Sequence, residues 1–412
     1  MWVVLTIIGL VLLYDVLWWR AADRFLRPLP NRWRWRAPLW LFMGAQMLCL
    51  LWIVFGRMLG GRPELDLPGW VMVVTFIWHL LVLPATVLAW LAVSTGRGIG
   101  AILRKLGPAI ATAPQPVEPA PAPAMSRRQL LGAAVAAAPP LVTSVGSVLA
   151  VPQLSRFRVR PMTVALPQLP PALDGLTIAH VTDIHVGRFT EGRVLSKIVE
   201  ATNDLRADLV LLTGDLINMN VSDLPAALDA VKRMEGRYGV YMCEGNHDLI
   251  ENGREFRRVT KASGVPLLVN ETLDLPVRGV NVKLLGLRWG SGRPGAGRAA
   301  DRSDGAIRAS LDELLPPVRQ DPESFPILLA HHPHAFDPAA EAGIPLTLSG
   351  HTHGGQLMLN EHIGFGPMMF RYWTGQYRKA DSRLVVSNGV GNWFPLRVAA
   401  PAEIVHLTMR RG

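Results

Sequence analysis

The sequence of 412 residues predicts an α/β domain that follows an α-helical membrane domain. Two observations lead to this expectation. Up to Ala150 the chain consists of long apolar runs rich in Trp and Leu, whereas from Val151 short apolar stretches alternate with Asp, Gly, His and Arg. A chain of this length also exceeds one ordinary domain. We therefore expect two structural parts that divide near residue 151.

Three apolar runs near the N-terminus are long enough to cross a bilayer, which takes about 20 helical residues. They cover residues 2–19, 38–55 and 70–93. Three such runs so close together in the chain argue against the alternative of buried core helices. The sequence therefore predicts a transmembrane domain of three helices over residues 1–94.

The positive charge of the chain lies mostly in this first part. Residues 1–150 hold 13 basic and 5 acidic residues, a net charge of +8 out of +10 for the whole chain. Because basic residues mark the cytoplasmic loops of membrane proteins, the excess indicates membrane topology, and a nucleic-acid partner loses its main support. The loop between the first two runs is expected in the cytoplasm because six arginines outnumber Asp23 there: Arg20, Arg24, Arg27, Arg32, Arg34 and Arg36.

A cytoplasmic linker is expected over residues 95–128, with Pro and Ala dominating 107–124 and with Arg127 and Arg128 at its end. A fourth, milder apolar segment follows at 129–151. It resembles either another anchor helix or an internal twin-arginine-type export signal, and the sequence leaves both open, including cleavage after the segment. Either alternative places residues 152–412 outside the cytoplasmic (inner) membrane, facing the periplasm or cell exterior.

Two ionisable residues, Asp15 and His79, fall in or near the predicted membrane helices. We expect structural roles for both: Asp15 near a helix end could reach the interface, and His79 could hydrogen-bond a neighbouring helix. The two cysteines, Cys49 and Cys243, fall in different parts of the chain, so no disulfide framework is predicted.

Five apolar runs in the second part are each followed by polar residues with glycine close by. The runs are 176–182, 209–213, 240–243, 327–330 and 346–349. Continuous apolar runs are typical of buried strands, and open α/β sheets bind ligands beyond the carboxyl ends of their strands. We therefore predict one shared site built from the residues that follow the runs: Asp183, His185, Asp215, Asn246, His247, Asp248, His331, His351 and His353.

The side chains of this set carry nitrogen and oxygen donors and no thiolate. Such donors suit Mn, Fe or Zn, and seven of them exceed what one ion needs. Two divalent ions that share a carboxylate are the economical solution. A pair about 4 Å apart can hold both the attacking and the leaving oxygen of a phosphoryl displacement. The set therefore favours hydrolysis of a phosphoester.

The ordered motifs Asp-x-His, Gly-Asp, Gly-Asn-His-Asp, His-x-Pro and Gly-His-x-His resemble those of the calcineurin-like metallophosphoesterases, over about residues 174–409. The stretches at 330–333, 350–356 and 385–391 look closest to the membrane-associated YkuE and YaeI branch. The resemblance implies a four-layer α-β-β-α sandwich. It also implies one metal on Asp183, His185, Asp215 and His353, and the other on Asp215, Asn246, His331 and His351. His247 would be the acid, with Asp248 orienting it.

The resemblance implies hydrolysis of phosphodiesters or pyrophosphates by a metal-bridging hydroxide, with lipid-linked substrates such as UDP-2,3-diacylglucosamine or phospholipid headgroups. A phosphomonoesterase of broad specificity and a non-catalytic membrane sensor remain alternatives, although the presence of both His247 and Asp248 argues against the sensor. A metallo-β-lactamase-like enzyme would need a His-x-His-x-Asp-His cluster, and the sequence has none.

Several further residues have competing interpretations. His332 competes with its neighbour His331 as a ligand, and the His-x-Pro spacing favours His331. Four other histidines are expected to be packed or hydrogen-bonded: His180, His334, His362 and His406. Three arginines could hold a phosphate, but surface salt bridges are the expectation for them: Arg188, Arg371 and Arg397.

Overall fold

The computed structural model describes residues 2–58, 67–106, 126–290, 304–360 and 362–412. The chain divides into two compact units, Met1–Val151 and Pro152–Gly412. The expected Pro/Ala-rich stretch at 107–124 lies outside the described residues.

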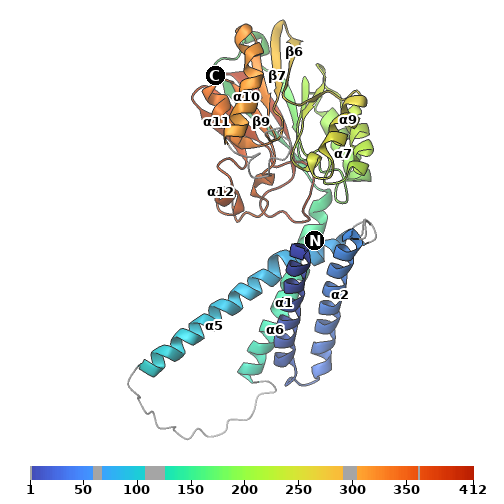
Figure 1. The fold of residues 1–412 in the computed structure, drawn as a ribbon, viewed down its shortest axis with the longest axis vertical. Coiled ribbons are helices and arrows are strands. Elements are labelled where there is room, and N and C mark those ends of the chain that lie inside the picture. Colours follow the sequence, from blue (N-terminus) through green and yellow to red (C-terminus); the bar gives the residue numbers. More distant parts are fainter. Residues whose placement is uncertain (1, 59–66, 107–125, 291–303, 361) are drawn as a thin grey trace. The chain divides into compact units, whose positions relative to one another are not determined.

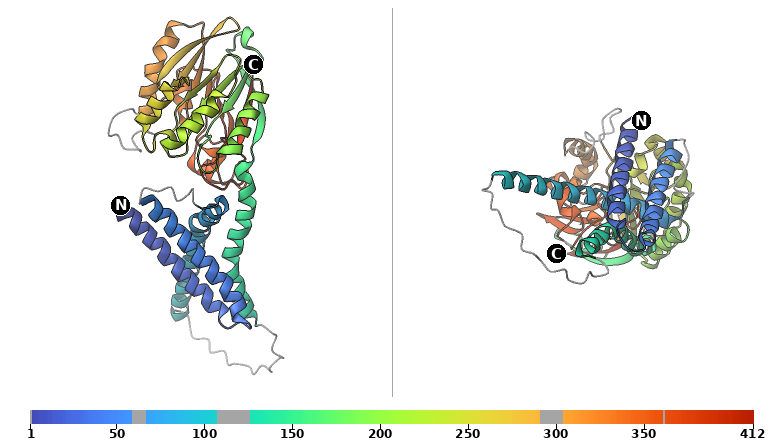
Figure 2. Two further views of the ribbon diagram at one scale, coloured as in Figure 1. Left: turned by 90° about the vertical axis from the view of Figure 1, so that its right-hand side faces the viewer. Right: turned by 90° about the horizontal axis from the view of Figure 1, so that it is seen from below.

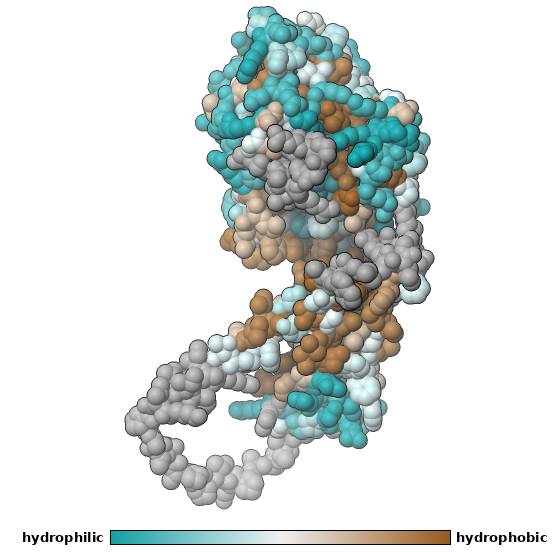
Figure 3. Space-filling model, viewed as in Figure 1, coloured by the Kyte–Doolittle hydropathy of each residue, from teal (hydrophilic) through white to brown (hydrophobic). Residues whose placement is uncertain are grey.

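The first unit is helical. Its elements are α1 (Trp2–Leu26), α2 (Arg32–Met58), α4 (Gly69–Ile77), the π-helical turn η1 (Trp78–Val82), α5 (Leu83–Leu106) and α6 (Arg127–Ala150). Helix α1 packs against α2 and α6 (Figures 1 and 2). Among the described residues, four spans are long and apolar enough to cross a membrane: Leu5–Leu26, Arg32–Gly56, Gly69–Gly96 and Gln129–Ser155. Apolar residues accordingly cover much of the surface of these helices in Figure 3.

Helices α1, α2 and α5 are longer than the apolar runs from which they were predicted. Helix α1 continues to Leu26 and α2 begins at Arg32, so the expected arginine-rich loop is reduced to a short turn. Asp23 explains the difference, because its carboxylate accepts from Arg27 Nε at 2.9 Å and from Arg36 Nε at 2.6 Å. These ion pairs hold the charged ends of both helices in helical form. Helix α5 likewise extends beyond residue 93, to Leu106.

The expectation that Asp15 reaches the membrane interface is wrong. Asp15 is fully buried, and its carboxylate accepts from Trp78 Nε1 at 2.8 Å and lies 3.2 Å from His79 Nε2. His79 Nδ1 lies 2.9 Å from the carbonyl oxygen of Thr75. An interhelical partner therefore satisfies the carboxylate, which would be costly to bury alone.

The second unit contains two six-stranded sheets. The first has the order β1-β12-β2-β3-β4-β5 and the second β10-β11-β9-β8-β7-β6. The strands of the first are β1 (Arg158–Leu166), β12 (Glu403–Arg411), β2 (Thr177–Val181), β3 (Leu209–Thr213), β4 (Val240–Cys243) and β5 (Leu267–Leu268). Those of the second are β10 (Gly375–Lys379), β11 (Ser382–Val386), β9 (Leu346–Ser349), β8 (Phe325–Leu329), β7 (Val280–Gly286) and β6 (Glu271–Val277).

Both sheets are parallel in their central part, which brings the carboxyl ends of the strands to one edge. Strands β2, β3, β4 and β5 pair in parallel, as do β7, β8, β9 and β11. Val181 is level with Leu212, and Thr213 is level with Cys243. The five runs predicted as strands correspond to β2, β3, β4, β8 and β9. The loops that follow them therefore start side by side.

The sheets pack face to face, and helices cover their outer faces. The layer between the sheets is apolar and includes Ile178, Leu211, Leu284 and Ile327, all fully buried. Helices α7 (Gly192–Asp204), α8 (Leu224–Lys232) and α9 (Gly253–Ala262) cover the first sheet, whereas α10 (Asp304–Gln320) and α11 (Phe336–Glu341) cover the second (Figure 1). The predicted α/β sandwich with two mixed sheets is confirmed.

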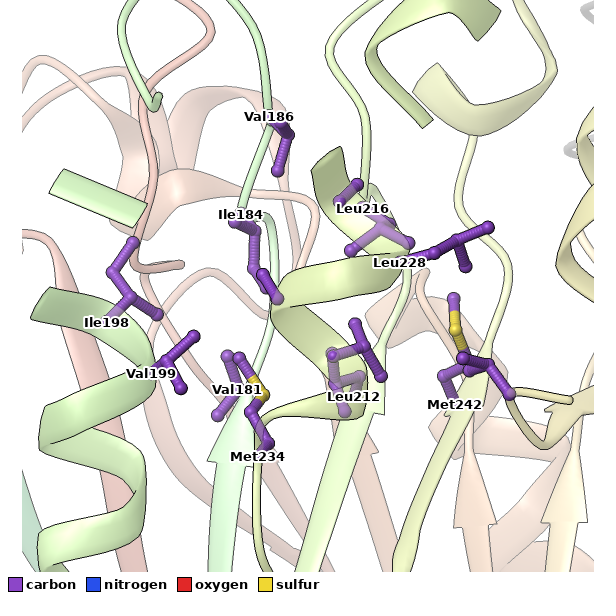
Figure 4. Packing of buried hydrophobic residues seen from close by; sticks show 14 of the residues in the cluster. Val181, Ile184, Val186, Ile198, Val199, Leu212, Leu216, Leu228, Met234 and Met242 are labelled. Atoms are coloured by element: carbon purple, nitrogen blue, oxygen red, sulfur yellow. The ribbon is translucent and has the colours of Figure 1, made fainter. Parts of the chain in front are cut away.

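Helical spacing explains how α7 covers its sheet. Its buried residues Leu195, Ile198, Val199 and Thr202 recur at intervals of three and four positions, which gives one apolar face. Figure 4 shows Ile198 and Val199 beside Val181 of β2, with Leu212 and Met242 of the next two strands in the same layer. This packing fixes the strands whose ends carry the candidate site.

Candidate metal centre

The loops at the strand ends have an unusual backbone. Five of the predicted ligands adopt positive φ angles between 49° and 72°: Asp183, His185, Asp215, His351 and His353. For residues other than glycine this left-handed conformation costs about 1 kcal/mol or more per residue. Its concentration in these loops marks them as candidates for a functional site.

The first group of side chains joins Asp183 and His185, which follow β2, to His353, which follows β9. Their candidate ligand atoms all lie within 4.8 Å of one another. The Nε2 atoms of His185 and His353 are 3.0 Å apart, and His353 Nε2 is 3.3 Å from Asp183 Oδ1. All three residues are buried. They come from both sheets and converge on one point.

The second group comprises Asp215, His331 and His351. Asp215 Oδ2 lies 3.1 Å from His331 Nε2 and 3.6 Å from His185 Nε2, so this oxygen lies between the two groups. The other ring nitrogen of His331 lies 2.6 Å from the carbonyl oxygen of Thr213. Donation to that carbonyl leaves Nε2 of His331 as the atom that faces the centre.

Asn246 supplies a test of whether these residues suit cations. Its Oδ1 atom is buried and has no hydrogen-bond partner among the described residues. An unpaired buried acceptor is costly, and a cation would satisfy it. The loops of Asp215 and Asn246 also touch through their backbones, since a Cβ on Gly214 would lie 2.6 Å from the nitrogen of Gly245. The donor set, the oxygen of Asn246 and the close loops fit divalent cations.

The electrostatics of the cluster follow from burial and close contact. Burial by itself would raise the pKa of Asp183, but the imidazoles of His353 and His331 outweigh it and hold this pKa well below its usual value. Burial lowers the pKa of both His351 and His353 well below normal. Ionised carboxylates beside neutral imidazoles are the forms in which these side chains bind metals.

His331 is the exception among the imidazoles. Burial opposes its charge, but the carboxylates of Asp215 and Asp183 prevail and raise the pKa of His331 to about 9. The charged form therefore pairs with Asp215 at the 3.1 Å distance given above.

His247 lies at the edge of the centre. Its backbone nitrogen donates to Asp215 Oδ1 at 2.7 Å, and its Nδ1 lies 2.5 Å from the carbonyl oxygen of Asn218. One of its ring nitrogens lies within 4.8 Å of the ligand atoms of His185 and Asp215. Burial, reinforced by His185, lowers the pKa of His247.

We expected Asp248 to orient the imidazole of His247, but both of its carboxylate oxygens accept from backbone nitrogens instead. Its two oxygens accept from the backbone nitrogens of Gly245 at 2.8 Å and Ile217 at 3.0 Å. The ring of His247 is held by the carbonyl of Asn218 instead. The carboxylate of Asp248 therefore links the loop after β3 to the loop after β4, because it accepts a hydrogen bond from a backbone nitrogen of each.

Residues 176–355 match the family model of the calcineurin-like phosphoesterases. The second unit contains a calcineurin-like metallophosphoesterase domain. All seven predicted metal ligands lie within the matched residues.

Two relatives of the chain are described as transmembrane proteins with this domain, and a third as a metallophosphoesterase. A "Transmembrane protein with metallophosphoesterase domain" from Danio rerio is 30% identical over 267 residues, which cover 62% of this chain and 58% of that protein. A protein of the same description from Bos taurus is 26% identical over 437 residues, which cover 98% of this chain and 87% of that protein. The uncharacterized metallophosphoesterase YkuE from Bacillus subtilis is 27% identical, covering 60% of this chain and 84% of YkuE. The chain thus spans less than two thirds of the first relative's length.

Two tryptophans that were not predicted from the sequence, Trp289 and Trp393, line the metallophosphoesterase centre. The ring of Trp289 lies 5.4 Å from that of His331 and 5.1 Å from that of His351. The ring of Trp393 lies 6.0 Å from that of His247. Trp289 follows β7, a parallel strand adjacent to β8. The rule that identified the ligands would have found Trp289 if it had been applied to β7.

Arg397 is not the surface residue that the sequence suggested. It is 3% exposed, and its Nη2 lies 2.9 Å from Nδ1 of His353 in the metallophosphoesterase centre. By contrast, Arg371 is exposed and pairs with Asp337 at 2.8 Å, as expected of a surface pair. Arg188 lies 3.8 Å from Glu191, but only 20% of its side chain is exposed, so it is not a surface residue either.

The ambiguous histidines occupy distinct environments. His331 faces Asp215, whereas Nδ1 of His332 accepts from the backbone nitrogen of His334 at 3.2 Å. His180 is fully buried with Nε2 2.9 Å from Thr213 Oγ1. The geometry thus favours His331 over His332 as the residue that belongs to the centre.

Proposed function

We propose that the metallophosphoesterase domain hydrolyses phosphoesters with two divalent cations. One cation would be held by Asp183, His185, Asp215 and His353, and the other by Asp215, Asn246, His331 and His351. The observation that carries the proposal is the position of Asp215 Oδ2, which is 3.6 Å from His185 Nε2 and 3.1 Å from His331 Nε2. A single carboxylate there can bridge two ions.

When bound, the ions would supply positive charge to the phosphoryl oxygens and acidify an attacking water. The residues of the chain would do the rest. His247 would give a proton to the leaving oxygen, with its ring fixed by the carbonyl of Asn218. Burial lowers the pKa of His247, which makes its protonated form a stronger acid but reduces the fraction of molecules that carry the proton. Trp289 and Trp393 would shield the centre from bulk water on two sides.

The identity of the ions is proposed as Mn, Fe or Zn, since the donors are nitrogen and carboxylate oxygen without sulfur. We further propose a phosphodiester or pyrophosphate substrate that is lipid-linked, such as UDP-2,3-diacylglucosamine or a phospholipid headgroup. A domain joined to membrane helices meets lipids at high effective concentration. The four described helical spans that are long and apolar enough to cross a membrane support this choice.

The proposed topology places residues 152–412 on the periplasmic or external side of the inner membrane, with the helices of residues 1–94 as anchor. The basic residues around the turn between α1 and α2 support a cytoplasmic location of that turn. Helix α6 begins at Arg127 with Ser126 as its cap, a form that suits both an anchor helix and a twin-arginine-type signal.

The proposal is tested with the purified full chain in detergent. Nitrophenyl diesters and monoesters are offered to the apoprotein and to protein loaded with Mn. We expect hydrolysis that depends on added metal and is faster on the diester. Preference for the monoester would instead support a broad phosphomonoesterase, and no turnover of either ester by the metal-loaded protein would support the non-catalytic sensor.

A further inference from the structure

An exposed apolar segment directly follows the loop that carries His351 and His353. Within residues 357–370, five large apolar side chains are exposed, and Leu359 and Met368 expose 81% and 79% of their surface. The other three are Ile363, Phe365 and Met369. In Figure 3 an apolar patch lies where Figure 1 places helix α12 (Phe365–Met369). Contiguous exposed apolar surface of this kind marks an interaction site.

The backbone of this segment is held in place by hydrogen bonds. The nitrogen of Met358 donates to the oxygen of Val398 at 2.9 Å, and the nitrogen of Phe365 donates to the oxygen of Leu357 at 3.1 Å. The side chain of Met358 points inward and is 3% exposed. The buried side chain of Met358 and these hydrogen bonds therefore fix the backbone of the segment, while the apolar side chains named above remain exposed.

The apolar segment is attached to the metal-ligand loop. The ring of Phe370 lies 5.9 Å from that of His351. Thr352, between the two histidines, donates from Oγ1 to the oxygen of Trp373 at 2.6 Å. Whatever covers the segment therefore lies next to the proposed catalytic centre.

Basic residues flank the apolar segment. Arg158 and Arg160 line a cavity of about 340 Å³ together with Met358 and His362. Both arginines pair with the single buried carboxylate of Glu403, at 2.7 Å and 3.4 Å. The two arginines and Glu403 therefore carry one net positive charge in the lining of this cavity. Apolar side chains beside arginines are the pattern of a surface that meets anionic lipid headgroups.

The chain itself limits what can reach this surface. Helix α6 ends at Ala150 and β1 begins at Arg158, so seven residues join the helix to the first strand, and five of them still belong to the candidate span Gln129–Ser155. Seven residues extend over at most about 25 Å. The domain is thus always within reach of a bilayer, whereas a soluble partner must be met by diffusion.

We propose that the described residues of this segment, 357–360 and 362–370, insert into the headgroup region of the bilayer that holds the chain's own helices, and that Arg158 and Arg160 contact lipid phosphates there. This inference rests on the proposed function, because its consequence is to present lipid phosphoesters to the metal centre. The insertion itself requires no catalysis.

The first experiment measures insertion in the full chain reconstituted into phosphatidylglycerol-containing proteoliposomes. An environment-sensitive fluorophore is attached to Met368→Cys in a Cys49→Ser background, since Cys243 is buried. The matched control carries the fluorophore at Lys261→Cys on α9, an exposed position outside the segment. Lipids with a nitroxide on the acyl chain should quench the probe at 368 at least fivefold more than the probe at 261.

The second experiment separates docking from catalysis. The double variant Leu359→Glu/Met368→Glu should keep the turnover of a soluble nitrophenyl diester and lose at least tenfold in turnover of a phosphoester lipid in the same proteoliposomes. Lys261→Glu is the control, because it adds negative charge at an exposed position of α9, outside both the segment and the wall of Arg158 and Arg160.

The outcomes distinguish the two proposals. Equal quenching of the probes at 368 and 261 overturns the insertion. Shielding of the probe at 368 that occurs only at high protein density also overturns it, because a second copy of the chain would then cover the segment. Loss of soluble turnover in the double variant also overturns it, since the segment would then be part of the centre. Strong lipid quenching at 368 in a protein that hydrolyses nothing upholds the insertion and contradicts the proposed function.

Discussion

Nη2 of Arg397 lies 2.9 Å from Nδ1 of His353, on the side of the ring opposite the centre that Nε2 faces. The guanidinium is itself fixed, because Nη2 donates to the oxygen of Gly391 at 2.6 Å and Nε donates to Oδ1 of Asn392 at 2.9 Å. Arg397 therefore fixes the orientation of the His353 ring, although it comes from a loop far along the chain.

Replacing Arg397 by Gln should change the affinity for metal by about 10-fold to 100-fold, the range usual for residues that contact a metal-ligating histidine. A guanidinium can only donate, so Arg397 favours the tautomer of His353 with its proton on Nε2, whereas Oε1 of Gln can accept from Nδ1 and leave Nε2 free for metal. We therefore expect tighter binding when the apoprotein is titrated with metal.

Arg371→Gln is the matched control for this prediction, since Arg371 pairs with Asp337 on the surface at 2.8 Å. Its metal affinity should equal that of the unmodified chain. An Arg397→Gln variant with the same affinity as Arg371→Gln would contradict the orienting role.

The proposed acid, His247, can be separated from the metal ligands by the leaving group of the substrate. Alkoxides need a proton as they leave, whereas nitrophenolate leaves nearly unaided. His247→Ala should therefore slow alkyl esters by about 10²-fold to 10⁴-fold and nitrophenyl esters far less, with metal content unchanged. Measuring kcat for both esters beside metal stoichiometry decides it. An equal loss on both esters, or loss of an ion, would rule out the acid role.

Asp248 should act on the stability of the centre. Its carboxylate accepts from the nitrogens of Gly245 and Ile217. In Asp248→Asn one amide hydrogen atom would face a backbone donor, at a cost of about 1–3 kcal/mol. We expect a lower midpoint of thermal unfolding and an unchanged ratio of alkyl to nitrophenyl turnover. A changed ratio with an unchanged midpoint would restore the direct role in orienting His247 that the sequence suggested.

The topology makes an independent prediction. A reporter fused after Gly412 should be active as alkaline phosphatase and dark as green fluorescent protein, because the domain is proposed to face the cell exterior. If α6 also acts as a twin-arginine-type signal, replacing Arg127 and Arg128 by Lys should block export. A fluorescent fusion without phosphatase activity would reverse the proposed orientation.

Much of the centre could be predicted because its ligands follow strands that are short, continuous apolar runs. The runs at 209–213 and 240–243 are β3 and β4 to the residue, and Asp215 and Asn246 come two and three residues later. Parallel pairing then brings these ends together without further information. The same rule applied to β7 and β11 leads to Trp289 and to the loop that ends in Arg397.

Other contacts depend on distances along the chain that no local pattern reveals. Asp15 and Trp78 are 63 residues apart, so the composition around Asp15 could not indicate its partner. The role of Arg397 depends on His353, 44 positions away, and on backbone carbonyls whose directions exist only in the folded loop. The longer extent of α1 and α2 follows from Asp23, which pairs with Arg36 across the turn.

The central claim is that Asp215 joins two cations, and metal stoichiometry tests it most directly. Elemental analysis of the purified full chain after loading and desalting should find two divalent ions per chain. Asp215→Asn removes the charge and keeps the size of the side chain whose Oδ2 lies between His185 and His331. This variant should lose ions from both sites together with its activity. An Asp215→Asn protein that retains two ions per chain would contradict the account.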